Sequence, residues 1–170
     1  MAIIADQKNA LAPILSPSPK TKNQGETYLK FQLDRQTSAL IAMSQAQEVI
    51  LLPAHRLTAI PNMPPYVLGL INRRSRVIWV IHLAQMLGLN DTLVHGQQYH
   101  VVAIRDGSIS LGVVVQNVAG VIRLLPENIQ SAQGQILKAF GPYLRGCTLL
   151  EKEIFLVLDA PGIIRNLPPS

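Results

Sequence analysis

The 170-residue sequence has little charge, few aromatic residues and one cysteine, and each shortage excludes a class of protein. With Cys147 alone, the chain forms neither an internal disulfide bond nor a zinc module built on several cysteines. Charged residues make up 15% of the sequence, against about 25% in a typical globular domain. Apolar residues make up 48%, which is enough for a core. We therefore expect a folded domain whose weakly charged surface binds other proteins.

Long hydrophobic runs are also missing. The longest, such as residues 77–81, are far shorter than the roughly 20 residues that a helix needs to cross a bilayer. The first six residues lack the basic start and apolar stretch of a secretory signal. We expect a cytoplasmic protein that does not insert directly into a membrane.

The sequence contains no pattern typical of catalysis or metal binding. His95 and His100 are five residues apart, which matches no common zinc signature. The sequence has no Gly-x-Ser-x-Gly elbow, no glycine-rich phosphate loop and no obvious base next to Cys147. We therefore expect a protein that is not an enzyme and that has no cofactor and no metal site.

Residues 1–25 differ in composition from the rest of the chain. Pro13, Pro17 and Pro19 lie among serines, and Lys20 and Lys22 follow. Proline-rich polar stretches stay extended and seldom join a packed core. We expect a flexible tail here, followed by the folded domain over residues 26–168.

From residue 28 onward the pattern is one of short strands. Tyr28–Leu33 alternates apolar with other residues at period two, which is typical of a strand with one buried face. Short helices are expected at 82–87, before Gly88, and at 159–165, where Asp159 is a good N-cap. Closely spaced strands favour small antiparallel barrels over a parallel α/β sheet. The expected strands cover residues 28–33, 39–43, 48–52, 68–71, 77–81, 99–104, 109–115, 118–125, 144–150 and 154–158.

The densest basic site is the turn expected at residues 72–76, with Arg73, Arg74 and Arg76. These arginines account for +3 of the net charge of +5, and the tail accounts for the other +2. A solvated turn and a protein contact both fit, because the guanidinium group grips carboxylates. A nucleic-acid contact would need stacking aromatics, and only Trp79 is near. The basic pI is thus no general nucleic-acid signature, and we expect no nucleic-acid partner.

The stretch from Ile60 to Leu83 resembles the CheW family of chemotaxis coupling proteins. Residues 47–49, 112–118, 143–146 and 156–159 are similar to further elements of that family, so the resemblance spans about residues 27–166. The positions of the central stretch that fit the family pattern in register are Pro64, Val67, Gly69, Leu70, Asn72, Arg74, Val77, Ile78, Val80 and Leu83.

The resemblance implies a mainly β fold: two small five-stranded SH3-like β-barrels, interleaved and packed together, with short helices including a C-terminal one. It implies a non-catalytic adaptor of two-component signalling. Such an adaptor couples the cytoplasmic helical-bundle tip of a chemoreceptor to the regulatory domain of a CheA-type histidine kinase. The protein is then a monomer or part of membrane-associated receptor–kinase arrays.

By the same resemblance, partner-binding residues cluster around the basic turn. Glu48, Leu68, Arg74, Val77 and Ile78 occupy or neighbour receptor-contact positions. The resemblance further implies that Gly69 and Asn72 shape the turn that presents Arg74. A simpler alternative is that the motif only fixes the backbone of the first barrel. The remaining candidates are Arg73 and Arg76 of the turn and Trp79, a large aromatic suited to an interface anchor.

Four positions depart from the family pattern. Ser75 replaces a glycine, Trp79 a proline, and His82 and Gln116 replace aspartates. The departures indicate a specialised relative, for example from a type IV pilus motility or phototaxis array. Two alternatives stay open: a receptor-binding decoy or regulator that has lost kinase coupling, and a basic small-barrel nucleic-acid-binding protein.

Overall fold

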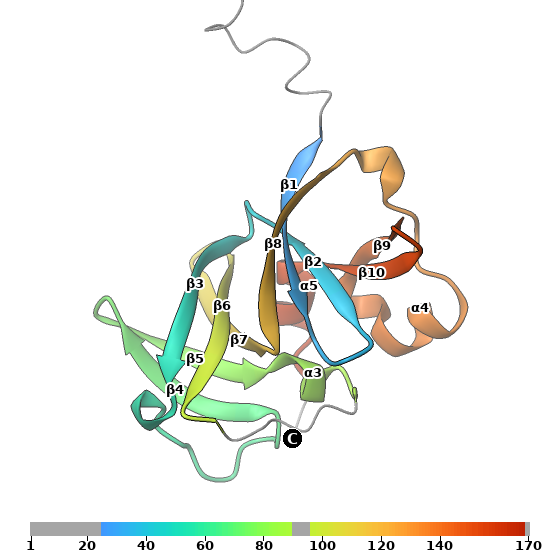
Figure 1. Ribbon diagram of the computed structural model, residues 1–170. Coiled ribbons are helices and arrows are strands. Elements are labelled where there is room, and N and C mark those ends of the chain that lie inside the picture. Colours follow the sequence, from blue (N-terminus) through green and yellow to red (C-terminus); the bar gives the residue numbers. More distant parts are fainter. Residues whose placement is uncertain (1–24, 90–95, 169–170) are drawn as a thin grey trace, which may run out of the picture.

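The computed structural model describes residues 25–89 and 96–168, which form two five-stranded sheets (Figure 1). We call the first sheet barrel 1; its order is β3-β6-β7-β5-β4. The second, barrel 2, has the order β8-β1-β2-β10-β9. The predicted mainly β fold with two small barrels is therefore confirmed. The expected tail lies outside the described residues except for Gly25, and His95 lies outside them too.

The strands agree closely with the expected ones. Barrel 1 consists of β3 (Ala46–Pro53), β4 (Val67–Arg73), β5 (Arg76–His82), β6 (Gln98–Asp106) and β7 (Ile109–Val115). Barrel 2 consists of β1 (Glu26–Gln32), β2 (Ser38–Ala42), β8 (Asn117–Leu124), β9 (Leu144–Leu150) and β10 (Glu153–Leu158). Neighbouring strands pair antiparallel, except for β5 with β7 and β2 with β10, which are parallel.

Three apolar cores follow from the alternation of side chains along the strands. Barrel 1 has its own core, which contains Val80 and Val114, and barrel 2 has another, which contains Leu40. The largest core lies between the barrels and contains Val113 of β7. Strands such as β7 are thus apolar on both faces because each face meets a different core.

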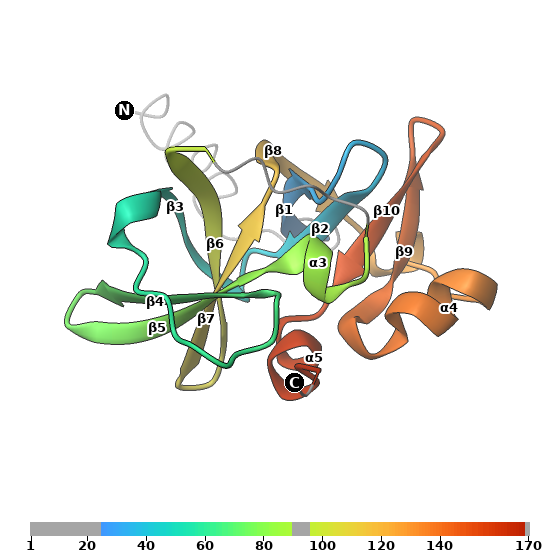
Figure 2. The ribbon, with the colours of Figure 1, turned by 90° about the horizontal axis from the view of Figure 1, so that it is seen from below.

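The chain passes from one barrel to the other twice (Figure 2). It leaves barrel 2 through residues 43–45 between β2 and β3 and returns at Gln116 between β7 and β8. Asp159 then links β10 to the C-terminal helix. Barrel 1 is therefore one continuous stretch of sequence, and barrel 2 is built from both sides of it.

The two expected helices are present as α3 (Leu83–Met86) and α5 (Ala160–Arg165). Three short 3₁₀ helices, η1 (Ala54–Arg56), η2 (Pro126–Asn128) and η3 (Gly141–Tyr143), connect strands. Helix α4 (Gly134–Phe140) was not predicted. It starts inside the polar loop expected through Gln135, and its seven residues are too few to give a clear helical period. In the described part of the chain, no helix is long and apolar enough to cross a membrane.

The expected five-residue basic turn is shorter in the structure. Only Arg74 and Ser75 form it, with φ of 53° and 64°, and Arg73 pairs with Arg76 across it. Positive φ at both central residues is typical of the type I′ turn that suits a two-residue hairpin. Asn72 is not part of this turn, because it lies in β4 opposite Val77; its part in presenting Arg74 stays a prediction.

Gly69 lies outside the turn as well. It lies at the other end of β4, at an irregularity in the pairing with β5, with φ of 145°. A Cβ atom there would lie 2.3 Å from the carbonyl oxygen of Thr58. Gly69 therefore allows the close bridge between Thr58 and Leu70 that anchors the preceding loop to the sheet.

Candidate partner-binding site

An ion pair joins β3 and β4, the two edge strands of barrel 1. Arg73 donates from Nε to Oε1 of Glu48 at 3.1 Å and from Nη2 to Oε2 at 2.9 Å. These hydrogen bonds lower the pKa of the Glu48 carboxyl below its ordinary value, although partial burial opposes the shift. The pair connects the sheet edges at the open side of the barrel.

Arg74 takes a different position. Its Nη2 lies 3.6 Å from Oε2 of Glu48, and 80% of its side chain is exposed. Arg76 is exposed as well. Glu48 contacts two guanidinium groups, and Arg76 adds a third positive charge. The tip of the hairpin therefore stays positively charged and can bind the carboxylate of a partner.

Beside the hairpin, apolar side chains cover the outer face of β5. Val77 is 68% exposed and Trp79 is 39% exposed. Ile109 of β7 is exposed next to them. A groove of about 500 Å³, which we call the Trp79 groove, is lined by Met63, Tyr66, Trp79, Ile109, Ile164 and Leu167, among others. Its floor includes Ile81 and Leu111 of the inter-barrel core.

The structure brings most of the expected residues together on the hairpin and turns others inward. Ile78 is only 7% exposed and packs in the core of barrel 1, because side chains alternate along β5. Gly69 is buried, and Leu68 is half-buried against the same core. The lining residues Met63, Ile109 and Leu167 were missed. From the sequence, Ile109 was expected only as the first residue of the strand over residues 109–115.

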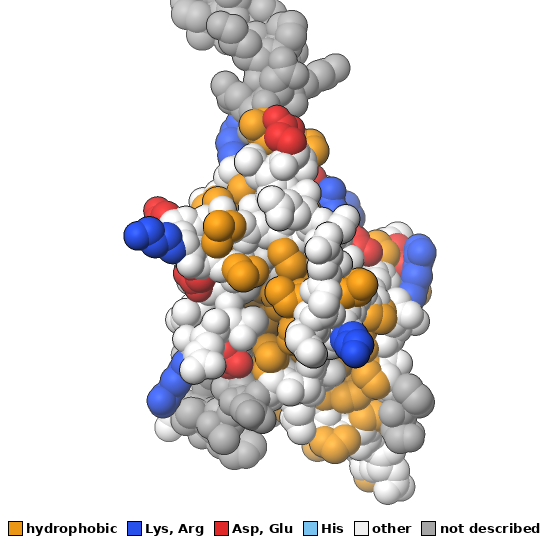
Figure 3. Space-filling model, turned by 90° about the vertical axis from the view of Figure 1, so that its right-hand side faces the viewer, with side chains coloured by type: hydrophobic (Ala, Val, Ile, Leu, Met, Phe, Trp, Pro, Cys, Tyr) orange, Lys and Arg blue, Asp and Glu red, His pale blue; other side chains and the backbone are white. Residues whose placement is uncertain are grey.

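A second exposed apolar surface lies on barrel 2. Leu149 and Ile154 are paired across β9 and β10 and are 67% and 54% exposed. Leu137 of α4 is exposed too. We call the surface formed by Leu149 and Ile154 the barrel-2 patch. Figure 3 faces the side of the molecule with β9, β10 and α4, where hydrophobic side chains gather over the middle and lower part.

The hollow beside the barrel-2 patch has a volume of about 630 Å³. Its lining includes Cys147 and Thr148 of β9 and Gln133. Burial raises the pKa of the Cys147 thiol, which makes it a poor nucleophile. Among residues 25–89 and 96–168, no group of three or more His, Cys, Asp or Glu side chains could hold a metal ion. The two surfaces thus offer apolar contact and arginine hydrogen bonds, which suit protein binding.

Together, the two barrels and their exposed apolar faces define a small double-barrel protein with surfaces suited to protein binding. A family model, the CheW-like domain, matches residues 27–167. The chain therefore belongs to the CheW family of chemotaxis adaptor and scaffold proteins.

Individual relatives agree with this assignment. The chain is 24% identical over 139 residues to the chemotaxis protein CheW of Thermotoga maritima, which covers 82% of this chain and 87% of that protein. It is 31% identical over 103 residues to the chemotaxis protein CheW of Treponema pallidum, covering 59% and 61%. The crystal structure of the scaffolding protein TtCheW from Thermoanaerobacter tengcongensis has the same fold. The TM-score is 0.72 at 17% identity, over 86% of this chain and 97% of that one.

Proposed function

We propose that this protein couples the helical-bundle tip of a chemoreceptor to the regulatory domain of a CheA-type histidine kinase. The observation that supports the proposal is that each barrel carries its own exposed apolar surface. A coupling protein must hold two partners at once, and monomeric proteins rarely expose large apolar patches without a partner.

We assign the receptor tip to the Trp79 groove and the adjacent hairpin. An amphipathic helix binds such a groove through apolar side chains spaced three and four residues apart. Trp79 is the kind of half-exposed aromatic that dominates binding energy at interfaces. Arg74, exposed at the tip, then pairs with a carboxylate at the rim of the helix.

We assign the kinase regulatory domain to the barrel-2 patch. The resemblance implies that this kinase domain consists of the same small barrels. A flat, apolar strand surface such as Leu149 and Ile154 is suited to packing against another barrel. With the partners on different barrels, both can bind at the same time.

The proposed setting is the cytoplasm, from which the protein is recruited to membrane-associated receptor arrays. The departures at Ser75, Trp79, His82 and Gln116 favour a specialised array, such as one for type IV pilus motility or phototaxis. Of these four residues, Trp79 supports the proposal most directly because its side chain lines the proposed receptor groove.

The experiment is a binding titration of the receptor tip and of the kinase regulatory domain at near-physiological salt. Arg74→Glu should weaken receptor binding about tenfold or more because it opposes a partner carboxylate, and kinase binding should persist. The matched control is Arg35→Glu, which reverses an exposed charge in the β1–β2 turn. If neither partner binds the wild type, the coupling function is wrong.

Two other outcomes identify the alternatives. Receptor binding without kinase binding would indicate a decoy or regulator. Tight nucleic-acid binding that falls steeply with ionic strength would indicate a nucleic-acid-binding barrel. Adaptor binding on apolar faces should change little over the same range of salt.

A further inference from the structure

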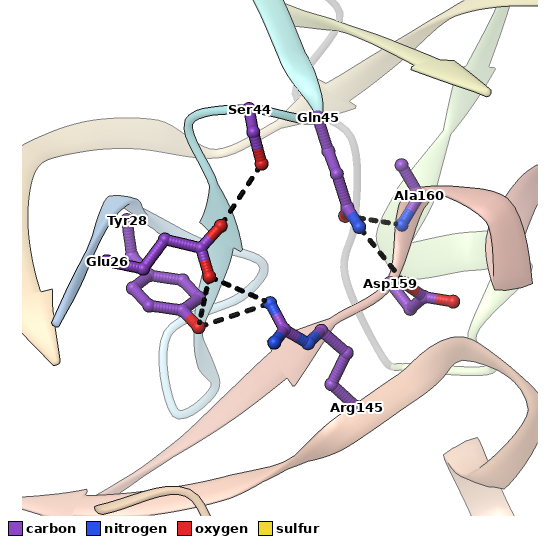
Figure 4. Close-up of polar contacts among 7 residues, drawn as sticks. All are labelled: Glu26, Tyr28, Ser44, Gln45, Arg145, Asp159 and Ala160. Carbon is purple, nitrogen blue, oxygen red and sulfur yellow. Dashed lines mark hydrogen bonds and ion pairs between the residues drawn. The ribbon is translucent and has the colours of Figure 1, made fainter. Parts of the chain in front are cut away.

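We propose that Gln45 is a positioning residue: its side-chain amide holds α5 in place and thereby shapes the Trp79 groove. The proposal rests on the proposed function only in taking this groove as the receptor site. Figure 4 shows the amide of Gln45, which belongs to the β2–β3 crossing, next to Asp159 and Ala160 at the link from β10 to α5.

The amide of Gln45 makes two hydrogen bonds to the start of α5. Its Oε1 accepts from the backbone nitrogen of Ala160 at 2.9 Å. Its Nε2 donates to Oδ1 of Asp159 at 3.2 Å. One side chain thus uses a donor and an acceptor together, which is the property that distinguishes an amide from a carboxylate.

These bonds complete the hydrogen bonding of the first turn of α5. Asp159 caps the helix, because its Oδ2 accepts from Gly162 N at 3.1 Å. Pro161 has no N–H group. Ala160 is fully buried, so its N–H needs a partner inside the protein. Gln45 supplies the acceptor that the cap of the helix does not.

Helix α5 has six residues and cannot be stable alone, so its place depends on such ties. At its far end, the hydroxyl of Tyr66 donates to the carbonyl of Pro168. Leu167, just past the helix, lines the same groove as Trp79. A shift of α5 therefore changes the shape of the groove and the exposure of Trp79.

The backbone of Gln45 is itself fixed to both barrels. Its N–H donates to Ala42 O at 2.9 Å at the end of β2, and its carbonyl accepts from Arg105 N at 3.0 Å on β6. The neighbouring Ser44 donates to Glu26 of β1 at 3.1 Å (Figure 4). These backbone hydrogen bonds fix Gln45 independently of α5. Gln45 therefore positions the helix, and the helix does not position Gln45.

The chemistry of the contact gives a specific test with Gln45→Glu. A carboxylate at this place can accept from Ala160 N but cannot donate to Asp159. At neutral pH two carboxylates then lie within hydrogen-bonding distance and repel each other, whereas at lower pH they share a proton and the second bond returns. Gln45→Met keeps the length of the side chain, lacks both bonds and has no such pH dependence.

Trp79 is the only tryptophan of the chain, so its fluorescence reports on the groove. In Gln45→Glu at pH 7.5, acrylamide should quench it about 1.5-fold more strongly than in the wild type, and the difference should shrink near pH 5. Gln45→Met should show the increase at both pH values. Gln36→Glu, the same change at an exposed glutamine, should match the wild type throughout.

Wild-type quenching in both Gln45 variants would overturn the proposal, even if their unfolding midpoints fell, because Gln45 would then only add stability. If Gln45→Glu does not fold at pH 7.5, Gln45→Met decides alone. Receptor-tip binding measured on the same variants separates the two proposals. Stronger quenching with unchanged receptor binding contradicts the groove as receptor site and leaves the role of Gln45 intact.

Discussion

Arg73 and Arg74 are neighbours in sequence but have opposite roles at Glu48. Arg73 binds the carboxylate through two hydrogen bonds, while Arg74 approaches it only to 3.6 Å and remains 80% exposed. The tight turn causes this division, because Arg73 is the last residue of β4 and Arg74 lies in the turn with φ of 53°. One arginine stabilises the barrel, and the other is available to a partner.

The strained turn predicts a stabilising substitution. Ser75 has φ of 64°, a conformation that glycine adopts without a Cβ penalty. Ser75→Gly should raise the free energy of unfolding by about 0.5–1 kcal/mol, after the larger entropy of the unfolded chain is included. Urea denaturation with an unchanged m value measures the gain. Ser110→Gly, in the extended strand β7, should instead lower stability, and a loss in Ser75→Gly would contradict the turn assignment.

Gly69→Ala should be strongly destabilising. The new Cβ would lie 2.3 Å from the backbone oxygen of Thr58, and neither backbone segment can yield cheaply. We expect a loss of about 2–4 kcal/mol in the free energy of unfolding. Gly107→Ala is the control, since Gly107 also has positive φ but no atom near a new Cβ. It should cost only about 1 kcal/mol, and equal losses in the two variants would argue against the close contact.

The Glu48–Arg73 pair predicts a pH dependence. Because the pKa of Glu48 is lowered in the folded state, the pair stabilises the protein above the ordinary carboxyl pKa. This stability is lost as the pH falls through the lowered folded value. NMR titration of the Glu48 carboxyl should give a pKa below that of a model peptide, and Arg73→Met should raise it more than Arg74→Met does. Arg76→Met should leave it almost unchanged, since Arg76 is not among the groups that shift it.

If the two partners bind separate surfaces, a substitution on one surface should weaken the binding of one partner only. Leu149→Asp should weaken binding of the kinase regulatory domain about tenfold or more and leave receptor binding intact, because a charge replaces an exposed apolar contact. Ile109→Asp should do the reverse. Calorimetric titration of each variant with each partner measures both effects. If Leu149→Asp also loses the receptor, the partners do not occupy separate barrels.

Cys147 should react slowly with thiol reagents. Burial raises its pKa, so little thiolate is present at pH 7.5. In the native protein, reaction with a disulfide reagent should be about tenfold slower than for glutathione. Unfolding in urea should remove the difference. Fast reaction in the folded state would contradict the half-buried position of the side chain.

The strand pattern was predictable because local alternation and turn residues determine it. The ends of all ten strands lie within two residues of those expected, and the cap of α5 by Asp159 was correct. The two-residue hairpin turn was mistaken for a five-residue one, because cross-strand pairing kept Asn72 in β4. Helix α4 was missed since a seven-residue helix leaves little periodic signal.

The candidate partner-binding site was predictable only where a single hairpin forms it. The arginines and Trp79 could be placed on one hairpin from the sequence, but the groove also needs Met63 and Leu167, from loops distant in the chain. The contact between Gln45 and Ala160 joins residues 115 positions apart. Such long-range contacts depend on how the barrels pack, and local sequence patterns do not encode them.

The interleaved order of the strands has a consequence for synthesis on the ribosome. β3 to β7 follow one another, so barrel 1 can pair as its strands emerge. β1 and β2 emerge first but must await β8 and β10, their other neighbours. At about 5–20 residues per second the delay lasts roughly 5–20 s. During this time the apolar side chains of Phe31 and Leu40, which are fully buried in the folded protein, lack the strands that later cover them. The first hairpin therefore exposes a surface that a chaperone can bind during synthesis.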